Sequence, residues 1–291
     1  MNAILLAALL AASPAWPTDY TAVLREVMRN EEANREMWLH YTFEADIQEE
    51  ELAEDGSVKE RTRRKVRLVP TEQGFEITLL EKDGREPTPR ELQKYEKRNA
   101  KARRKAGKDR GGGADAKAQD GEEERDEEGN AREAWVVNTI RLVDPRFVGP
   151  EERDGRRTLR YEFAPRPGAE ARDLNEKFLH NIEGTMWVDE AERVVVEIEA
   201  RSVGRVRIKG GLAGLRDLDF RIRNAKVRDG VWFPESYEVL VELRILLGRM
   251  RTRTVTTYSN YRRAGVEVEE GPVWLPGAEP QPSPPAVPPE R

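Results

Sequence analysis

Residues 218–245 read LDFRIRNAKVRDGVWFPESYEVLVELRI and contain two runs of alternating apolar and polar residues around Asp229-Gly230. Alternation with a period of two is typical of a β-strand with one buried face. Asp-Gly suits a two-residue hairpin turn, because both central positions need a positive φ, which Gly adopts freely and Asp tolerates. The stretch therefore predicts an antiparallel β-hairpin.

Three further Asp-Gly pairs lie between alternating runs, at Asp55-Gly56, Asp83-Gly84 and Asp154-Gly155. The chain as a whole predicts about ten to twelve strands. An antiparallel sheet of this size tends to curl, split or close, because open twisted sheets rarely exceed about ten strands. The first half also carries two helix patterns. We therefore expect an α+β fold in which a strongly curved sheet or incomplete β-barrel encloses one or two helices, with a β-sandwich as the alternative.

Each predicted helix has its own signature. In the first, which Thr18 or Asp19 can cap, five apolar residues share one face: Tyr20, Val23, Leu24, Val27 and Met28. The second begins with the capping box Thr88-Pro89-Arg90-Glu91 and is predicted to reach about Lys105, with Leu92 and Tyr95 buried.

The chain divides into a leader, one β-domain and a tail. Residues 1–15 combine an apolar run with Ser13-Pro14-Ala15, which predicts a signal peptide and an exported, periplasmic or secreted protein. Residues 18–263 form the predicted β-domain. Within it, Gly107–Asn130 lacks large apolar residues and is predicted to be disordered. Residues 271–291 are rich in Pro and predict a flexible tail. The absence of Cys excludes a lipid-modified N-terminus, disulfides and thiolate sites.

Two hairpin motifs resemble a known family. Gly184-Thr185-Met186-Trp187-Val188-Asp189 and Asp229-Gly230-Val231-Trp232-Phe233-Pro234 are similar to signatures of bacterial outer-membrane lipoprotein-sorting proteins of the LolA/LolB type. The resemblance covers roughly residues 20–263. It implies an incomplete β-barrel closed by helices, with an apolar cavity that shields acyl chains of a lipid or lipoprotein. The charged insertion at 97–132 and the Pro-rich tail depart from the family pattern.

One-sided apolar strand faces supply the candidate ligand-binding residues. A curved sheet would aim these faces at a common interior. The candidates are Tyr41, Phe43, Ile77, Leu79, Tyr161, Phe163, Met186, Val188, Phe220, Ile222, Val239 and Val241. The same faces could equally form a packed core, and the sequence leaves both interpretations open. Trp187, Trp232 and Phe233 lie on or beside turns, where they could meet a ligand or pack the hairpin ends.

Charge is distributed unevenly along the chain. The net charge is −5, yet residues 201–263 contain fifteen Lys or Arg against six Asp or Glu. Alternation along strands places basic residues on one face, which predicts a basic surface stripe of Arg205, Arg207, Lys209, Arg221, Arg223, Arg249, Arg251 and Arg253. Such a stripe could contact anionic lipid head groups or an acidic partner, or it could be a solvated face paired with carboxylates. Export and the acidic total disfavour nucleic acid.

The sequence gives little support for catalysis. It holds two His residues, His40 and His180, and lacks nucleophile-elbow and zinc-protease motifs. No cofactor or metal is predicted. Three hypotheses follow. The sequence most favours a periplasmic carrier or sensor of an acyl chain, then a non-catalytic envelope scaffold with a packed β core, and least an unrecognised hydrolase.

Overall fold

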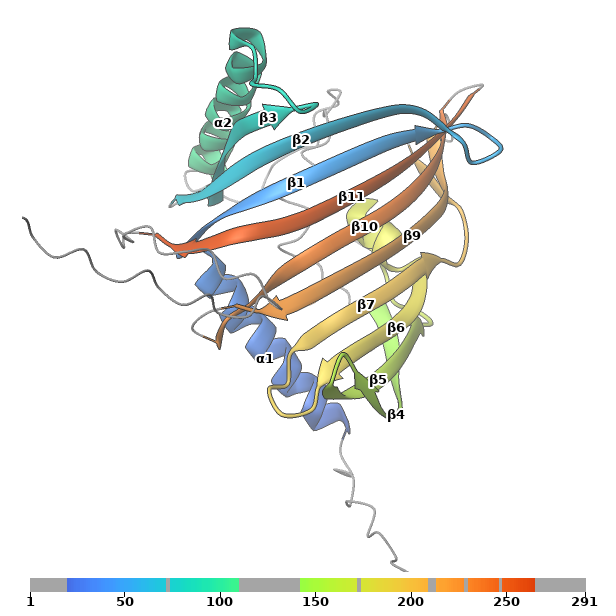
Figure 1. Cartoon of the computed structure of the whole chain (residues 1–291). Coiled ribbons are helices and arrows are strands. Elements are labelled where there is room, and N and C mark those ends of the chain that lie inside the picture. Colours follow the sequence, from blue (N-terminus) through green and yellow to red (C-terminus); the bar gives the residue numbers. More distant parts are fainter. Residues whose placement is uncertain are drawn as a thin grey trace, which may run out of the picture.

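The computed structural model describes residues 20–71, 74–109, 142–171, 174–208, 213–227, 230–245 and 248–264. Within these ranges, eleven strands form one antiparallel sheet (Figure 1). The strands are β1 (Tyr41–Leu52), β2 (Val58–Thr71), β3 (Gly74–Lys82), β4 (Val143–Arg153), β5 (Arg156–Pro165), β6 (Ile182–Asp189), β7 (Val195–Ser202), β8 (Val206–Ile208), β9 (Ala213–Lys226), β10 (Trp232–Ile245) and β11 (Gly248–Arg263).

The sheet is open and curved. Its strand order is β3-β2-β1-β11-β10-β9-β7-β6-β5-β4, and β8 pairs with β9 beside the end of β7. The first and last strands of the chain, β1 and β11, therefore pair in the middle of the sheet, while β3 and β4 form its edges. The predicted fold class, a curved antiparallel sheet of ten to twelve strands with helices, is confirmed.

The Asp-Gly pairs occupy different turns. Asp154 (φ 49°) and Gly155 (φ 71°) form the predicted tight turn between β4 and β5. Asp55-Gly56 joins β1 to β2, with a positive φ at Gly56. Gly230, also at positive φ, precedes β10, which pairs with β9, while Asp229 lies outside the described residues. Asp83-Gly84 differs, because its turn is closed by the single bridge of Lys82 with Arg85 and leads into a helix. Three of the four predicted hairpins therefore join paired strands.

Within the described residues, the helices that accompany the sheet are α1 (Tyr20–Trp38), α2 (Pro89–Asp109) and α4 (Leu174–Leu179). Figure 1 shows α1 crossing behind the sheet, near the ends of the strands, and α2 standing beside the edge strand β3. We call the side that α1 covers the apolar face and the opposite side the charged face. No helix in the described part of the chain is long and apolar enough to cross a membrane.

The edge strand β3 is protected by α2. The capping box forms as predicted: Thr88 N donates to Glu91 Oε2 (2.8 Å) and Glu91 N to Thr88 Oγ1 (3.4 Å). Asn99 then pairs with both backbone groups of Ile77, as a neighbouring strand would. Of the two residues predicted to be buried on this helix, Leu92 is 38% exposed, so its prediction is wrong. Tyr95 is partly buried and packs against the core. The helix continues to Asp109, four residues past its predicted end.

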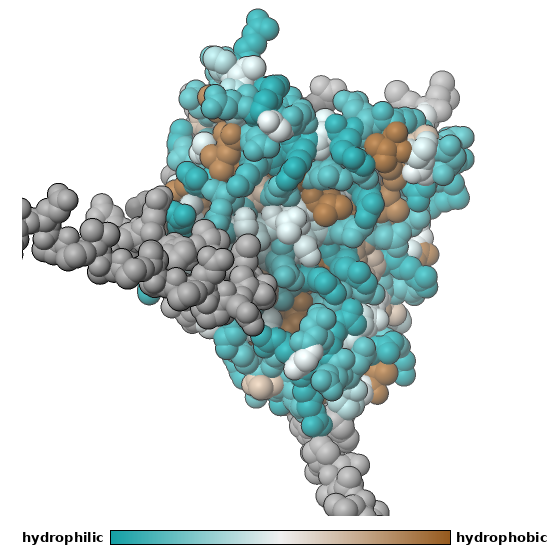
Figure 2. Space-filling view, in the orientation of Figure 1, coloured by the Kyte–Doolittle hydropathy of each residue, from teal (hydrophilic) through white to brown (hydrophobic). Residues whose placement is uncertain are grey.

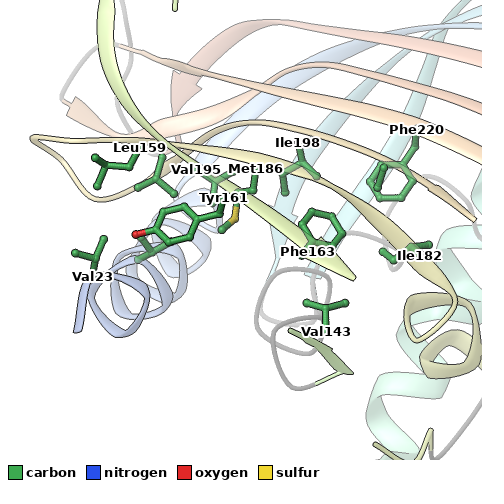
Figure 3. Close-up of a cluster of buried hydrophobic side chains, with 13 residues drawn as sticks. Val23, Val143, Leu159, Tyr161, Phe163, Ile182, Met186, Val195, Ile198 and Phe220 are labelled. Carbon is green, nitrogen blue, oxygen red and sulfur yellow. The ribbon is translucent and has the colours of Figure 1, made fainter. Parts of the chain in front are cut away.

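Two apolar clusters lie on the apolar face. The first gathers residues of β4–β7 and β9 around Val23 and Val27 of α1 (Figure 3). The second gathers β1–β3 around Phe233, with Met37 and Trp38 of α1 packed against it. A smaller third cluster, of Val206, Leu215 and Leu243, is covered by Phe178 of α4. The apolar positions of α1 therefore face the sheet, as their spacing predicts.

Several predicted segments fall outside the described residues. These are the signal peptide at 1–15, most of the insertion at 107–130, the tail at 271–291 and most of a strand expected at 135–143. In the described part, β4 begins at Val143 and contains Pro145 and Pro150. Proline is tolerated there because β4 is an edge strand.

Candidate functional site: the apolar face of the sheet

The twelve candidate ligand-binding residues divide into two groups. Nine are buried, and they lie in the first or second apolar cluster: Tyr41, Phe43, Ile77, Leu79, Tyr161, Phe163, Met186, Val188 and Phe220. The remaining three, Ile222, Val239 and Val241, are half-buried on β9 and β10. Most of the candidates therefore pack with one another, while the middle of the sheet keeps accessible apolar surface.

This accessible surface has a regular construction. Three cross-strand pairs place β9 and β10 side chains on the apolar face: Leu218 with Val241, Phe220 with Val239, and Ile222 with Tyr237. All except Phe220 are half-buried. We call Leu218, Ile222, Tyr237, Val239 and Val241 the mid-sheet stripe. Paired residues in an antiparallel ladder share one face, so the stripe is continuous.

A column of threonines borders the stripe on β11. Thr256, Thr254 and Thr252 pair with Tyr237, Val239 and Val241 respectively. Beyond them on β1 lie Ile47, Glu49 and Glu51, and Glu49 forms an ion pair with Arg64 of β2 (3.2 Å). The surface therefore changes from aliphatic to hydroxyl to charged within three strands.

The two ends of the stripe are closed by helices. At one end, Tyr237 packs against both large clusters, to which α1 contributes Val23, Val27 and Trp38. At the other end, Leu218 and Val241 pack against the third cluster together with Phe178 of α4. The stripe is thus a bounded apolar strip with one polar side.

Polar contacts fix α1 to the sheet. Asn30 Nδ2 donates to the carbonyl oxygens of Glu192 (2.9 Å) and Arg193 (3.2 Å) in the β6–β7 turn. Trp38 Nε1 donates to Trp232 O (2.8 Å), and Val195 N donates to Glu31 Oε1 (2.8 Å). Desolvation by burial raises the pKa of Glu31 to about 7, although the Val195 hydrogen bond lowers it. This helix is therefore held at fixed points, and one of those contacts is pH-sensitive.

The Gly184–Asp189 motif has structural roles. A Cβ at Gly184 would lie 2.1 Å from Glu199 O on β7, so only glycine allows β6 and β7 to approach. Asp189 Oδ1 accepts from Ala191 N and Glu192 N, both at 2.9 Å, and so shapes the following turn. Trp187 is buried on the charged face beneath Arg153, whose Cζ lies 3.8 Å from the ring centroid.

The second motif also packs the fold. Phe233 is 1% exposed, and its ring lies 4.5 Å from that of Tyr261 and 5.0 Å from that of Tyr41. Trp232 is buried and donates from Nε1 to Glu192 Oε2 (2.8 Å). The packing interpretation of Trp187, Trp232 and Phe233 is therefore the one that the structure supports.

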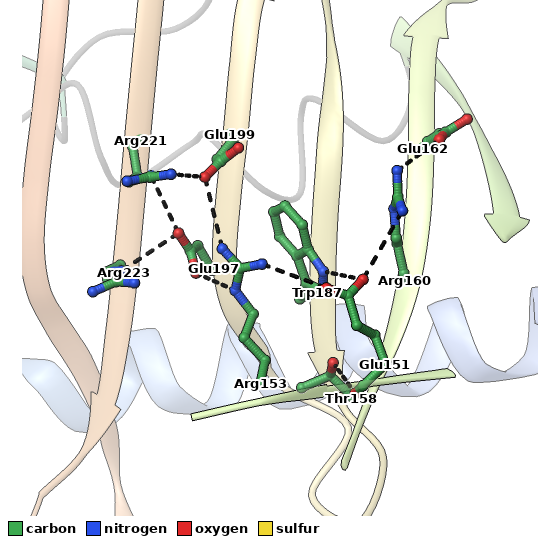
Figure 4. Close-up of polar contacts among 10 residues, drawn as sticks. All are labelled: Glu151, Arg153, Thr158, Arg160, Glu162, Trp187, Glu197, Glu199, Arg221 and Arg223. Atoms are coloured by element: carbon green, nitrogen blue, oxygen red, sulfur yellow. Dashed lines mark hydrogen bonds and ion pairs between the residues drawn. The ribbon is translucent and has the colours of Figure 1, made fainter. Parts of the chain in front are cut away.

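The charged face is built from cross-strand ion pairs (Figure 4). Glu197, 2% exposed, accepts from Arg153 Nε (2.5 Å) and lies near Arg221 (3.2 Å) and Arg223 (3.4 Å). Burial alone would raise the pKa of Glu197, but the hydrogen bond and charge of Arg153 hold it below its usual value. On β1, hydrogen bonds from Lys65, Arg67 and Asn260 outweigh burial and lower the pKa of Glu44 to about 2.

This pairing changes the interpretation of the basic stripe. Arg221 and Arg223 face Glu197 and Glu199, and Arg253 faces Glu238 (2.6 Å). The middle of the predicted stripe is therefore interleaved with carboxylates, which corrects the expectation of a continuous basic surface. Arg205, Arg207 and Arg249 are exposed, Arg251 pairs in register with Glu242, and Lys209 lies outside the described residues.

A hollow of about 1100 Å³ opens on the charged face. Charged residues dominate its lining, among them Arg146, Glu162, Glu183, Glu199, Arg201 and Arg221, with Phe163 and Phe220 also contributing. The charged groups that surround this hollow do not suit an acyl chain. The cavity anticipated on the apolar face is thus not this hollow.

The two histidines do not form a centre. His180 Nε2 lies 2.9 Å from Arg166 O, and His40 follows the end of α1. Over the described ranges, no group of three or more His, Asp or Glu side chains could hold a metal ion.

Comparisons with solved structures return several matches of low sequence identity. Matches include a domain named for outer membrane lipoprotein sorting from Vibrio parahaemolyticus (10% identity, TM-score 0.37, 85% of this chain and 95% of that one). A LolA superfamily protein from Nitrosomonas europaea matches at 13% identity and TM-score 0.35, over 84% of this chain and 94% of that one. A DUF1329 family protein from Desulfovibrio piger matches at 14% identity and TM-score 0.38, over 85% of this chain and 94% of that one.

These likenesses concern the fold alone. At such identities and TM-scores they say nothing about a ligand of this chain. No protein-family model matches the sequence, and no curated protein matches it.

Sequence reasoning missed part of the stripe and its border. Leu218, Tyr237 and the threonines of β11 were not among the candidates, although Thr252, Thr254 and Thr256 alternate with other residues in a strand pattern. Their period of two was a usable signal. The sequence pattern could not predict the register of β10 with β11, which places these threonines beside Val239 and Val241.

Proposed function

We propose that this protein is an exported, non-catalytic carrier or sensor that binds the acyl chain of a lipid or lipoprotein along the mid-sheet stripe. The observation that carries the proposal is the half-buried state of Leu218, Ile222, Val239 and Val241 between clusters that are otherwise buried. Apolar surface left accessible in this way is favourable for ligand burial, at about 0.8 kcal/mol per CH₂ group.

The border of the stripe supports the same proposal. An acyl chain ends in an ester, amide or carboxylate group that needs hydrogen-bond donors. Thr252 and Thr254 are half-buried hydroxyl donors next to Val241 and Val239, and Arg64 lies beyond them on β2. A chain lying on the stripe would therefore have its polar end within reach of the threonine column. The sequence resemblance to lipoprotein-sorting proteins points to the same ligand class.

Export belongs to the proposal as well. The apolar run of residues 1–15, ending in Ser13-Pro14-Ala15, has the pattern of a signal peptide. The mature chain would then begin at Trp16, which N-terminal sequencing of the protein from its native cell would establish.

Two neighbouring residues give a matched test of the binding site. Val239 lies on the stripe, whereas Leu240 lies on the charged face of the same strand. Val239→Gln puts an amide where the chain would lie, and we expect it to weaken binding of a fluorescent fatty-acyl probe at least about tenfold. Leu240→Gln should leave the affinity unchanged. Equal affinities of the two variants would place the probe elsewhere.

A packed envelope scaffold is the second candidate. It is favoured by the burial of nine of the twelve candidate residues. In that case the apolar face is simply a core, and contacts with other proteins run through charged surface. A wild-type protein that binds no acyl probe would favour this scaffold.

A further inference from the structure

One end of the charged face lacks the carboxylates that neutralise the rest. Arg207 of β8 pairs in register with Gly214 of β9, Gly214 with Arg244 of β10, and Arg244 with Arg249 of β11. Paired residues share a face, so the three arginine side chains form one row across four strands. We call Arg207, Arg244 and Arg249 the arginine row.

The row differs from every ion-paired part of the same face. Arg201, Arg216, Arg221, Arg223 and Arg253 each have a carboxylate within 4 Å. The three arginines of the row are exposed, and none of them has an ion pair or side-chain hydrogen bond with a described residue. Three cationic groups are therefore presented to solvent over roughly 14 Å, at about 4.8 Å per strand.

The arrangement opposes stability. Like charges directly opposite each other on neighbouring strands are destabilising, and Arg244 faces Arg249 in this way. Gly214 contributes no side chain between Arg207 and Arg244, so no carboxylate separates them. A row that lowers stability and faces solvent is typical of a binding surface.

The chemistry favours an extended anionic surface over a single small anion. The row runs across four strands, and the hollow on this face is lined by other residues. The same end is also apolar. Leu52 pairs with both Arg251 and Val58, and Val58 is 45% exposed.

We infer that this end of the sheet docks on an anionic lipid surface through Arg207, Arg244 and Arg249. The inference rests on the proposed function, since a carrier of acyl chains has to collect or deliver them at a membrane. Guanidinium groups pair with lipid phosphates through two parallel hydrogen bonds. Basic residues near such a surface each strengthen binding roughly fivefold.

The test is sedimentation of the full chain with lipid vesicles. Wild type should bind vesicles that contain phosphatidylglycerol, should not bind pure phosphatidylcholine vesicles, and should lose binding as salt rises. Arg244→Gln/Arg249→Gln should weaken binding about 30-fold. If that variant does not fold, Arg249→Gln alone should show a loss of about fivefold.

A control removes equal charge from the same face. Arg146 and Arg201 are exposed but are paired with Glu162 (2.6 Å) and Glu183 (2.7 Å). Arg146→Gln/Arg201→Gln should keep vesicle binding within about twofold, because these charges are already neutralised locally. Equal losses in the two double variants would overturn the inference, as would equal binding to both kinds of vesicle. Binding to polyglutamate without binding to vesicles would replace it with an acidic protein partner.

The result is separable from the proposed function. The row lies on the charged face, so Arg244→Gln/Arg249→Gln should bind the acyl probe like wild type. Loss of vesicle binding with intact probe binding therefore removes only the docking surface, whereas a wild type that binds vesicles but no probe contradicts the carrier.

Discussion

The two faces of this one sheet are stabilised in different ways. On the apolar face, cross-strand rows of aliphatic and aromatic residues are buried under α1 and α4, apart from the mid-sheet stripe. On the charged face, the rows alternate in sign, and Glu44 and Glu197 are buried beneath arginines and lysines. Figure 2 shows how hydrophilic the charged side is as a whole. The mid-sheet stripe interrupts the burial of the apolar face, because its side chains are only half-buried. The arginine row interrupts the ion pairing of the charged face, because its side chains have no carboxylate partner among the described residues.

The largest expected contrast is between two leucines. Leu159 is fully buried in the first cluster, and Leu240 is half-buried on the charged face. Leu159→Ala should lower the free energy of unfolding by about 2–5 kcal/mol, because it leaves a cavity. Leu240→Ala should lower it by less than about 1 kcal/mol. Urea denaturation measures both, and similar losses would show that the faces are equally packed.

Two carboxylates should respond to pH in opposite directions. The pKa of Glu44 is about 2, below its ordinary 4.5, so its contribution of about 3 kcal/mol exists above pH 4.5 and is lost as pH falls toward 2. The pKa of Glu31 is about 7, so ionisation destabilises the fold as pH rises from 4.5 to 7.

Glutamine variants isolate each effect. Glu44→Gln should be destabilised near neutral pH and should approach wild type near pH 2. Glu31→Gln should be more stable than wild type by about 3 kcal/mol above pH 7, with no difference below pH 4.5. Chemical denaturation across this range measures both, and parallel pH profiles for the two variants would contradict the assignment.

Ion pairs of the charged face should contribute more to stability where their carboxylate is buried than where it is exposed. Glu197→Gln leaves Arg153, Arg221 and Arg223 without their shared carboxylate and should cost about 2 kcal/mol. Glu238, whose side chain is 43% exposed, pairs with Arg253, and Glu238→Gln should cost less than about 1 kcal/mol. Equal unfolding midpoints would mean that Glu197 contributes no more than a surface pair.

The smallest expected effect is a gain. Arg249→Glu replaces a like-charged cross-strand pair with an opposite one, and should raise stability by about 0.5 kcal/mol. Thermal unfolding of the variant measures the gain. A drop in stability would mean that Arg249 and Arg244 do not repel each other in the native chain.

Local signals in the sequence predicted the local elements well. The tight turn at Asp154-Gly155, the Thr88 capping box and the apolar side of α1 all depend on residues close together in the chain. The strand β4 contains Pro145 and Pro150, which argue against a strand unless it lies at an edge. Which strands are edges is a property of the whole sheet.

The candidate site was predictable only in part. Alternation identified Ile222, Val239 and Val241 as facing inward, but it could not tell them from buried residues such as Tyr161. Likewise, the arginines of residues 201–263 predicted a continuous basic surface. Their carboxylate partners, such as Glu197 and Glu199, lie on β7, and only the register of β7 with β9 brings them together.

The most direct measurement of the central claim uses Ile222→Trp, read out by acyl-probe binding and by unfolding. If the stripe is a ligand site, wild type binds a fluorescent fatty-acyl probe, and Ile222→Trp fills accessible space. That variant then remains within about 1 kcal/mol of wild type in stability but loses the probe. The contrary result is a wild type that binds no probe, together with a variant destabilised by about 1–3 kcal/mol through overpacking. In that case the apolar face is a packed core throughout.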